Sequence, residues 1–408
     1  MSWIEEALGL DAQSAYGIAT LPYAVGSRNR ERPIVLVRIG DRALDLAEVS
    51  RALDHPHRDV FAQPSLNALM ALGRQECGEV RAWVRTLLTD DTHRELVEQQ
   101  LISVEEVELQ LPFEVADYVD FYASEVHASN VGKIFRPDSP GLPPNWKHLP
   151  IGYHGRAGTV VVSGSDVVRP TGQRRPGADG VPPFGSSVTL DIECEVGFVV
   201  SGPTERGTRV SVREARDHLF GVVILNDWSA RDIQAWEYVP LGPFLGKSFA
   251  TSISAWVVPF EAFAEAEVDL PGQEPAVLPY LQGETDRDAF GLDLHLEVRI
   301  NGTVVSSPEY RDMYWSPAQM LAHLTVNGAS LRDGDLFASG TVSGAERTTF
   351  GSLLERTWNG TEPLTLDDGS TRGFLEDGDV VTISGWAPGP DGTRITLGDV
   401  TGTVTPST

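Results

Sequence analysis

The stretch Thr189-Leu-Asp-Ile-Glu-Cys-Glu-Val-Gly-Phe198 alternates between apolar and acidic side chains. Because side chains on a strand point to opposite faces with a period of two, the alternation predicts a strand with Asp191, Glu193 and Glu195 on one face. Two interpretations of that face are open. It is either a solvated acidic face, the commoner case for a half-buried strand, or part of a site that holds a hard divalent cation through carboxylate oxygens.

The composition excludes several classes of protein. A chain of 408 residues suggests two domains, and its 41% of hydrophobic residues can form a sizeable core. The 40 Gly and 27 Pro, spread without repeats, favour a turn-rich β architecture. A net charge of −26 argues against a nucleic-acid or anionic-membrane surface, because both need clustered Lys and Arg. Two cysteines form neither a disulfide framework nor zinc-binding spacing.

The sequence also predicts where the protein resides. No stretch approaches about 18 apolar residues, so no membrane-spanning helix is expected. The first residues, Met1 to Glu6, are neither basic nor followed by a long apolar run, so no signal peptide is expected. We therefore expect a cytoplasmic protein.

The first block of the chain, residues 1–116, reads as a small mixed β domain. The apolar runs Ile34–Ile39 and Ala43–Leu46, separated by Gly40-Asp41, predict a hairpin. Apolar residues at helical spacing predict a helical region over residues 79–99.

The second block, residues 117–408, reads as a larger β domain. The apolar run Phe220–Asp227 predicts a buried strand, and Asn301-Gly302 between alternating stretches predicts a second hairpin. Ser316–Gln319 has the pattern of a capping box with Pro at the first helical position. Residues 261–291 are acidic and irregular, which predicts a surface insertion.

Carboxylates that could complete a cation site occur elsewhere in the chain. Asp227 ends the apolar run Phe220–Asp227, where a carboxylate either caps the next turn or points inward as a ligand. Together with Asp120, Glu193 and Glu195 it would offer one cation four carboxylates, a set that suits Ca²⁺, Mg²⁺ or Mn²⁺.

Several motifs, taken together, resemble the fumarylacetoacetase family. The resemblance covers the whole chain in order and is densest over residues 117–255. The stretches that carry it are Asp120-Phe-Tyr, His127-Ala-Ser-Asn-Val-Gly132, Leu149-Pro-Ile-Gly-Tyr-His-Gly-Arg156, Asp191-Ile-Glu-Cys-Glu195, Asn226-Asp-Trp-Ser-Ala-Arg-Asp-Ile-Gln234, Gly246-Lys-Ser-Phe249 and Ser339-Gly-Thr-Val-Ser-Gly344.

The resemblance implies a fold and an activity. The fold would be mainly β (α+β), with a small SH3-like β-barrel over residues 1–116 and a larger mixed β-roll domain over residues 117–408 that forms a homodimer. The activity would be hydrolysis of the carbon–carbon bond in 4-fumarylacetoacetate, a β-diketone, to fumarate and acetoacetate at the end of tyrosine and phenylalanine catabolism.

The resemblance also implies roles for individual residues. His127 would activate water with Glu355 as its partner. Groups that would polarise the reacting carbonyl are Arg231, Gln234 and Lys247. Substrate-binding positions would be Tyr122, Arg136, Gln234, Tyr238 and Thr341. Metal ligands would be Asp120, Glu193, Glu195 and Asp227, with Lys247 and Thr251 beside Asp227 at a second, Mg²⁺-type site, so Ca²⁺ and Mg²⁺ are the expected cofactors.

Two other functions are open. Because a fold does not fix the substrate, the same carboxylate site could hydrolyse, decarboxylate or isomerise other 2-oxo or 3-oxo acids. The chain could also be a non-catalytic binding protein stabilised by Ca²⁺, in which case replacing His127 would change nothing.

Overall fold

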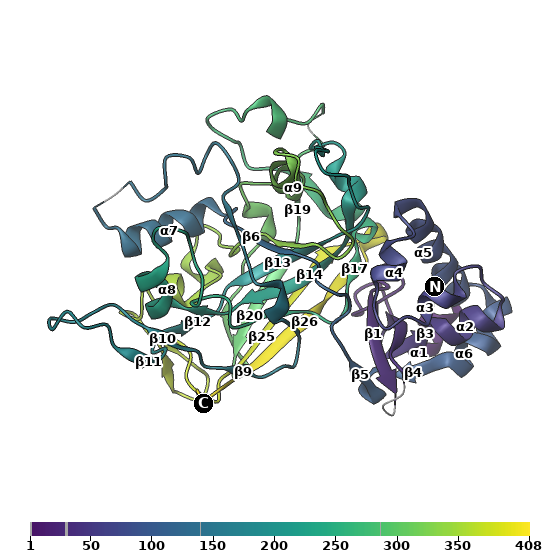
Figure 1. The fold of residues 1–408 in the computed structure, drawn as a ribbon. Coiled ribbons are helices and arrows are strands. Elements are labelled where there is room, and N and C mark those ends of the chain that lie inside the picture. The colour runs from purple at the N-terminus through teal and green to yellow at the C-terminus, as the bar shows by residue number, and fades with distance from the viewer. Residues whose placement is uncertain (1, 29–31, 139, 286) are drawn as a thin grey trace.

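The computed structural model describes residues 2–28, 32–138, 140–285 and 287–408. The amino-terminal residues, drawn in purple, gather at one side of the molecule, and the two largest β-layers of the remaining chain lie beside them (Figure 1). Strands dominate and most helices are short, so the expectation of a mainly β, α+β fold is confirmed. The described residues include no helix with the length and apolar character that a membrane crossing requires.

The amino-terminal residues form a five-stranded antiparallel sheet in the order β4-β3-β2-β1-β5. The hairpin predicted at Gly40-Asp41 is confirmed, because β2 and β3 pair across it. The strands are β1 (Tyr23–Arg28), β2 (Ile34–Ile39), β3 (Arg42–Asp45), β4 (Leu101–Ser103) and β5 (Val107–Leu109).

Short helices cover this sheet. The helical region predicted over residues 79–99 is two helices, because Asp90 is extended and its side chain accepts a hydrogen bond from Thr92 N, which starts a new turn. The main helices are α1 (Trp3–Leu8), α2 (Leu46–Ala52), α5 (Arg74–Thr89) and α6 (Arg94–Gln100), with single turns at α3 (Arg58–Phe61) and α4 (Asn67–Met70).

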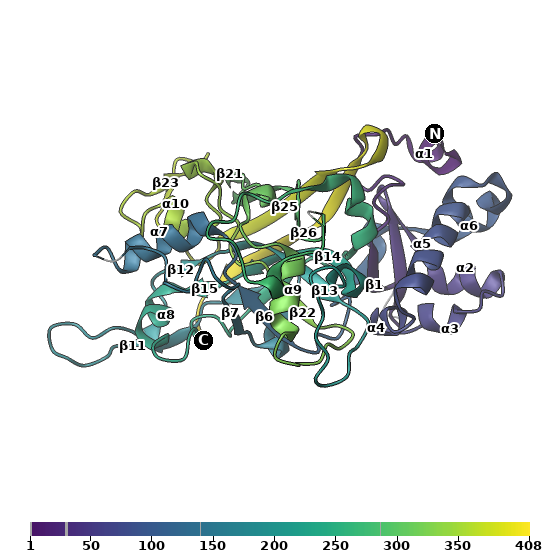
Figure 2. The same cartoon turned by 90° about the horizontal axis from the view of Figure 1, so that it is seen from above.

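The amino-terminal sheet packs directly against the rest of the chain. Figure 2 shows it between helices α2, α5 and α6 and the larger body. Ala24 and Leu36 share an apolar cluster with Trp256, and Tyr23 and Val257 exchange two backbone hydrogen bonds of 2.8 Å. These contacts fix the amino-terminal sheet against the central sheet that carries the candidate site.

The central sheet has the order β7-β6-β22-β13-β14-β16-β8. Strands β6 and β22 are parallel, as are β16 and β8, and the other neighbours are antiparallel. The predicted buried strand is confirmed as β14. The strands are β6 (Tyr118–Phe121), β7 (Gly152–His154), β8 (Val160–Val162), β13 (Cys194–Val200), β14 (Leu219–Asp227), β16 (Thr251–Ile253) and β22 (Leu336–Ala338), and β17 (Val258–Pro259) also pairs with β14.

A second sheet packs on the central one and encloses the main core. Its order is β21-β20-β25-β26-β9, and Ile224 of β14 shares one apolar cluster with Leu296 and Ile383. The hairpin predicted at Asn301-Gly302 is confirmed, with positive φ at both residues as a tight two-residue turn requires. The strands are β9 (Val167–Val168), β20 (His295–Ile300), β21 (Thr303–Ser306), β25 (Val380–Pro388) and β26 (Arg394–Thr405).

Two sequence-based expectations need correction. The stretch Thr189–Phe198 is not one strand: β12 (Leu190–Asp191) pairs with β15 (Ser229–Ala230), and β13 begins only at Cys194. Residues 261–291 are not a simple surface insertion, because Phe263, Leu281 and Phe290 from this segment are buried in the main core.

The capping box predicted at Ser316 is confirmed and begins α9 (Pro317–Thr325). Three further helices carry site residues. They are α7 (Glu125–Phe135), α8 (Arg231–Glu237) and the single turn α10 (Leu353–Arg356).

Candidate active site

The four carboxylates singled out in the sequence converge at one end of the central sheet. Asp120 lies on β6, Glu195 lies near the start of β13, Asp227 ends β14, and Glu193 lies in the break between β12 and β13. All four are buried, and each offers an oxygen within 4.8 Å of an oxygen of every other member. We call Asp120, Glu193, Glu195 and Asp227 the carboxylate cluster.

The electrostatics of the cluster suit a cation. Burial, together with repulsion from neighbouring carboxylates, raises the pKa of Asp120 and of Glu195 well above the usual range. Within the described parts of the chain, Asp120 Oδ1, Glu195 Oε1 and Asp227 Oδ1 are buried without a hydrogen-bond partner. Buried carboxylate oxygens that lack partners are the hard donors that Ca²⁺ and Mg²⁺ take as ligands, so these residues fit such an ion.

Two buried cationic side chains border the cluster. Lys247 Nζ forms ion pairs with Glu193 and Asp227, and Arg231 Nη2 lies 2.8 Å from Glu193 Oε1. Burial alone would raise the pKa of Glu193, but these two cations hold it well below its usual range. Gln234 joins the group, since its side-chain oxygen accepts a hydrogen bond from Arg231 Nη1 at 3.2 Å.

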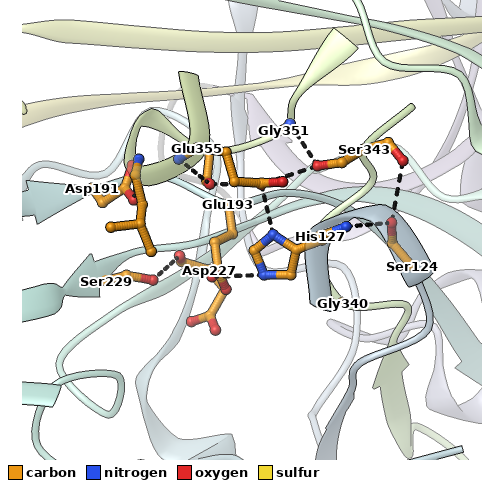
Figure 3. Close-up of polar contacts among 12 residues, drawn as sticks. Ser124, His127, Asp191, Glu193, Asp227, Ser229, Gly340, Ser343, Gly351 and Glu355 are labelled. Carbon is orange, nitrogen blue, oxygen red and sulfur yellow. Dashed lines mark hydrogen bonds and ion pairs between the residues drawn. The ribbon is translucent and has the colours of Figure 1, made fainter. Parts of the chain in front are cut away.

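His127 and Glu355 form a buried pair beside the carboxylate cluster (Figure 3). His127 Nδ1 lies 2.6 Å from Glu355 Oε2, and His127 Nε2 lies 3.7 Å from Glu193 Oε1. Each member of the pair is the third residue of a helix whose preceding serine caps its backbone N–H: Ser124 for His127 and Ser352 for Glu355. The caps hold both side chains on rigid first turns.

A set of donors keeps Glu355 ionised. Asn130, Ser343 and Ser352 donate hydrogen bonds to its carboxylate at 3.0, 3.0 and 2.8 Å. Burial alone would raise the pKa of Glu355, but the imidazole of His127 and these donors hold it below its usual value. An ionised carboxylate accepts from His127 Nδ1–H, which leaves Nε2, the nitrogen nearer the cluster, as a proton acceptor.

The backbone at Gly340 approaches the backbone of Phe121 closely beside the carboxylate cluster. Gly340 has φ of 75°, and a Cβ there would lie 2.2 Å from Phe121 O, so only glycine fits. Gly340 N donates to Glu195 Oε2 at 3.1 Å. The next residue, Thr341, is buried, and its hydroxyl has no hydrogen-bond partner among the described residues.

The remaining residues of the predicted substrate-binding and second metal sites lie at different depths. The ring of Tyr122 packs edge-on against the imidazole of His127, with 5.3 Å between centroids. Thr251 is buried and pairs in register with Asp227. Arg136 follows the end of α7 and Tyr238 the end of α8, and Arg136 is exposed, with its guanidinium donating to Gly141 O at 3.4 Å. The structure therefore places Tyr122 and Thr251 next to His127 and Asp227, whereas Arg136 and Tyr238 lie just beyond the ends of helices.

Sequence reasoning missed several residues that support the site. The sequence places Asp191 only on the acidic face of a strand, and no pattern in it assigns a role to Asn130 or Ser343. One local signal was available: Ser352 and Glu355 have the spacing of a capping box, which would have placed Glu355 in a first helical turn.

Comparison with known proteins identifies the family. The model described as "Fumarylacetoacetate (FAA) hydrolase C-terminal" matches residues 118–405, and "Fumarylacetoacetase N-terminal" matches residues 19–112. The chain belongs to the fumarylacetoacetate hydrolase family. The carboxylate cluster, His127 and Glu355 all lie within the range matched by the carboxy-terminal model.

Relatives match over almost the full length. The fumarylacetoacetase of Homo sapiens is 45% identical over 412 residues, covering 97% of this chain and 97% of that protein. The fumarylacetoacetase of Arabidopsis thaliana is 42% identical over 424 residues and both chains are covered completely. Among solved structures, a fumarylacetoacetate hydrolase from psychrophilic Exiguobacterium antarcticum shares the fold, with a TM-score of 0.55 at 16% identity, covering 95% of this chain and 99% of that one.

Proposed function

We infer that this chain is a hydrolase that cleaves 4-fumarylacetoacetate to fumarate and acetoacetate, the last step of tyrosine and phenylalanine catabolism. Full-length relatives that are more than 40% identical carry the name of this activity. The observation that gives the activity a mechanism is the buried His127–Glu355 pair, whose second ring nitrogen, Nε2, lies 3.7 Å from Glu193 in the carboxylate cluster.

Water activation is assigned to His127. Its Nε2 takes a proton from water while Glu355 holds Nδ1–H and balances the charge of the imidazolium that forms. The hydroxide adds to the carbonyl carbon on the fumaryl side of the diketone. The carbon–carbon bond then breaks, its electron pair leaves with the acetoacetate fragment as an enolate, and the imidazolium returns the proton to that fragment.

Stabilisation of the oxyanion that develops on the attacked carbonyl is assigned to Arg231, Gln234 and Lys247. All three lie beside Glu193 or each other at the edge of the carboxylate cluster, and Arg231 and Lys247 are buried. Donors fixed in such a position stabilise a transition-state oxyanion by about 3 kcal/mol each. Local cations are also needed because the net charge of −26 repels an anionic substrate.

The carboxylate cluster is proposed to hold Ca²⁺ or Mg²⁺, with Asp120, Glu193, Glu195 and Asp227 as ligands. A bound ion would supply Lewis-acid stabilisation of the substrate's enolate oxygens. Lys247 and Thr251, with Asp227, are proposed to border a second, Mg²⁺-type site. The partnerless oxygens of Asp120, Glu195 and Asp227 support the first assignment.

Substrate binding is proposed for Tyr122, Arg136, Gln234, Tyr238 and Thr341. The strongest support comes from the hydroxyl of Thr341, which is buried beside Gly340 and has no partner in the described chain. Tyr122 supports the assignment through its contact with the imidazole of His127.

Replacing Arg136 with lysine tests the assignment of a substrate carboxylate to this residue. Lysine keeps the charge but loses the planar fork that binds a carboxylate through two parallel hydrogen bonds. We expect KM for fumarylacetoacetate to rise several-fold, about 1 kcal/mol of binding, with kcat less affected. Lys133→Arg, in the last turn of the helix that Arg136 follows, is the control and should change neither constant. Unchanged kinetics in Arg136→Lys would give Arg136 a structural role.

Substrate identity is tested by comparing kcat/KM for fumarylacetoacetate with that for acylpyruvates, using the metal-loaded protein. We expect the fumarylacetoacetate value to be higher. Faster turnover of acylpyruvates would assign the site to another oxo acid. Ca²⁺ binding with no turnover of either substrate, and no effect of changing His127, would support the non-catalytic alternative.

The assembly is proposed to be a homodimer. Apolar side chains are exposed on the β10–β11 hairpin (Thr171–Gln173 and Phe184–Ser186) and on the loop after α8, including Phe184 at 75% and Leu241 at 96%. The two segments lie together in Figure 1, and Ser187 and Val188 bond to Asp232 of α8. Apolar area of this kind is typical of interaction surfaces.

The double replacement Leu241→Asp and Phe244→Asp tests this surface. Two buried charges facing a partner would cost more than the interface gains, so we expect the variant to elute as a monomer in size-exclusion chromatography with light scattering. Leu278→Asp, exposed on the 261–291 segment, is the control and should remain dimeric. A wild-type protein that is monomeric at micromolar concentration would refute the proposal.

Three further assignments are proposals of the same kind. The division at residues 116 and 117 is supported by the two family models, which end at 112 and begin at 118. The SH3-like barrel type is supported by the five-stranded amino-terminal sheet. A cytoplasmic location is supported by two free cysteines, Cys77 and Cys194.

A further inference from the structure

Asp191 lies between the two groups of catalytic candidates: it contacts Arg231 in one group, and it contacts the backbone of Leu353 and Leu354, just before Glu355, in the other. It is completely buried at the end of β12, in register with Ser229. Its carboxylate accepts from Arg231 Nε at 2.8 Å, from Leu353 N at 2.7 Å and from Leu354 N at 3.0 Å. None of the functions proposed above uses this residue.

The contacts to Leu353 and Leu354 hold the turn that carries Glu355. These residues are the first two of α10, a helix of four residues, which is too short to be stable alone. The first N–H groups of a helix have no partner within it. Asp191 accepts from the first two and Ser352 from the third, that of Glu355, so side chains satisfy all three of these N–H groups.

The contact to Arg231 fixes the guanidinium in one orientation. Nε bonds to Asp191, which turns Nη1 toward Gln234 and Nη2 toward Glu193. A planar guanidinium held at one edge presents its other donors in a fixed direction. Without Asp191, Arg231 would keep its charge but lose this constraint.

We propose that Asp191 is a positioning residue that aligns the water-activating pair with the oxyanion-stabilising group by holding Glu355's helical turn and Arg231 on one carboxylate. The inference rests on the proposed function, since it concerns the alignment of groups assigned there. Asp191 is neither one of the proposed metal ligands nor one of the proposed substrate-binding residues. Its effect should therefore appear in the chemical step rather than in binding.

The test is the isosteric change Asp191→Asn in the full-length, Ca²⁺-loaded protein. The side-chain oxygen of asparagine can still accept hydrogen bonds. Its NH₂ group, in the place of Oδ2, would face the N–H donors of Arg231 and Leu354 and could not accept from them. We expect kcat for fumarylacetoacetate to fall by roughly 10- to 100-fold, because small misplacements of catalytic groups have effects of this order. KM and the amount of Ca²⁺ bound should change less than two- to threefold, about the spread of ordinary context effects.

A control separates positioning from general destabilisation. Asp379 is also a buried aspartate that accepts from an arginine Nε, that of Arg372, and from a backbone N–H, that of Glu376. These partners, and Asn301, which also donates to Asp379, are not site residues. Asp379→Asn should lower the melting temperature at least as much as Asp191→Asn while leaving kcat unchanged.

Double-mutant cycles give the decisive readout. If Asp191 acts through Arg231 and Glu355, Asp191→Asn should cost much less kcat in an Arg231→Gln background and in a Glu355→Gln background than in the wild type. The proposal would be overturned if Asp191→Asn lowered kcat by the same factor in both backgrounds as in the wild type. An unchanged kcat in Asp191→Asn itself would also overturn it. If Asp191→Asn does not fold, Asp191→Glu retains the charge and is expected to fold with reduced kcat; wild-type kcat in that variant would also overturn it. Wild-type turnover, measured first, separates failure of the proposed function from failure of this inference.

Discussion

Replacing His127 with glutamine is expected to lower kcat/KM for fumarylacetoacetate by about 10²–10⁴, the usual contribution of a general base. Glutamine keeps much of the volume and can still bond to Glu355, but it cannot accept a proton from water. His127 is not among the proposed metal ligands, so bound metal and melting temperature should stay close to wild type. The measurement is steady-state kinetics on protein of confirmed metal content.

Related variants sharpen this result. Glu355→Gln should lose less than His127→Gln, because it removes only the charge that orients and balances the imidazole. His323→Gln is the matched control, since His323 is a half-buried helical histidine bonded to Tyr280 and remote from the carboxylate cluster. A folded, metal-loaded His127→Gln protein within a few-fold of wild type, small beside the general-base range, would mean that another group activates the water.

Replacing Asp227 with alanine is expected to abolish measurable turnover and the stabilisation of the protein by Ca²⁺ or Mg²⁺. The change removes one of the four carboxylates and takes an ion-pair partner from Lys247 and a hydrogen-bond acceptor from Tyr153. A ligand that binds only the native state at 100 times its Kd stabilises by about 2.7 kcal/mol, so loss of binding is visible as loss of a melting-temperature shift. The measurements are thermal unfolding with and without each ion, and elemental analysis.

The control for Asp227 is a buried carboxylate outside the site. Asp335 accepts a hydrogen bond from Arg332 N, and burial raises its pKa to about 6. Asp335→Ala should lower the melting temperature but leave the Ca²⁺-dependent shift and the activity in place. A fully active wild-type preparation that contains no divalent metal would contradict the assignment of the carboxylate cluster.

Local patterns predicted the elements that depend on local interactions. The apolar run of β14, the Asn301-Gly302 turn and the Ser316 capping box each specify their structure through neighbours in sequence, and all three are confirmed. The alternation over Thr189–Phe198 misled because the backbone leaves the sheet at Glu193, where it bridges to Ser352, a residue far along the chain. The prediction of a surface insertion over residues 261–291 is wrong because the acidic composition of this segment hides three apolar side chains, Phe263, Leu281 and Phe290, that pack in the main core.

The residues of the site also divide into those that local sequence patterns predict and those that only long-range contacts bring together. The carboxylates were found because each stands out against an apolar strand or motif. The pairing of His127 with Glu355 spans 228 residues, and no local pattern encodes it, so only the family resemblance supplied it. The supporting contacts of Asn130, Ser343 and Asp191 are also long-range, and serine, asparagine and aspartate are common enough that their positions carry no signal alone.

Hydrolysis of fumarylacetoacetate in oxygen-18 water tests the central proposal most directly. Enzyme-activated water that adds to the fumaryl carbonyl must give one fumarate and one acetoacetate for each diketone consumed, with one labelled oxygen in a carboxylate of fumarate. Substrate recovered before completion serves as the control and should be unlabelled. Unlabelled fumarate, or products other than this pair, would contradict the mechanism built on His127, Glu355 and the carboxylate cluster.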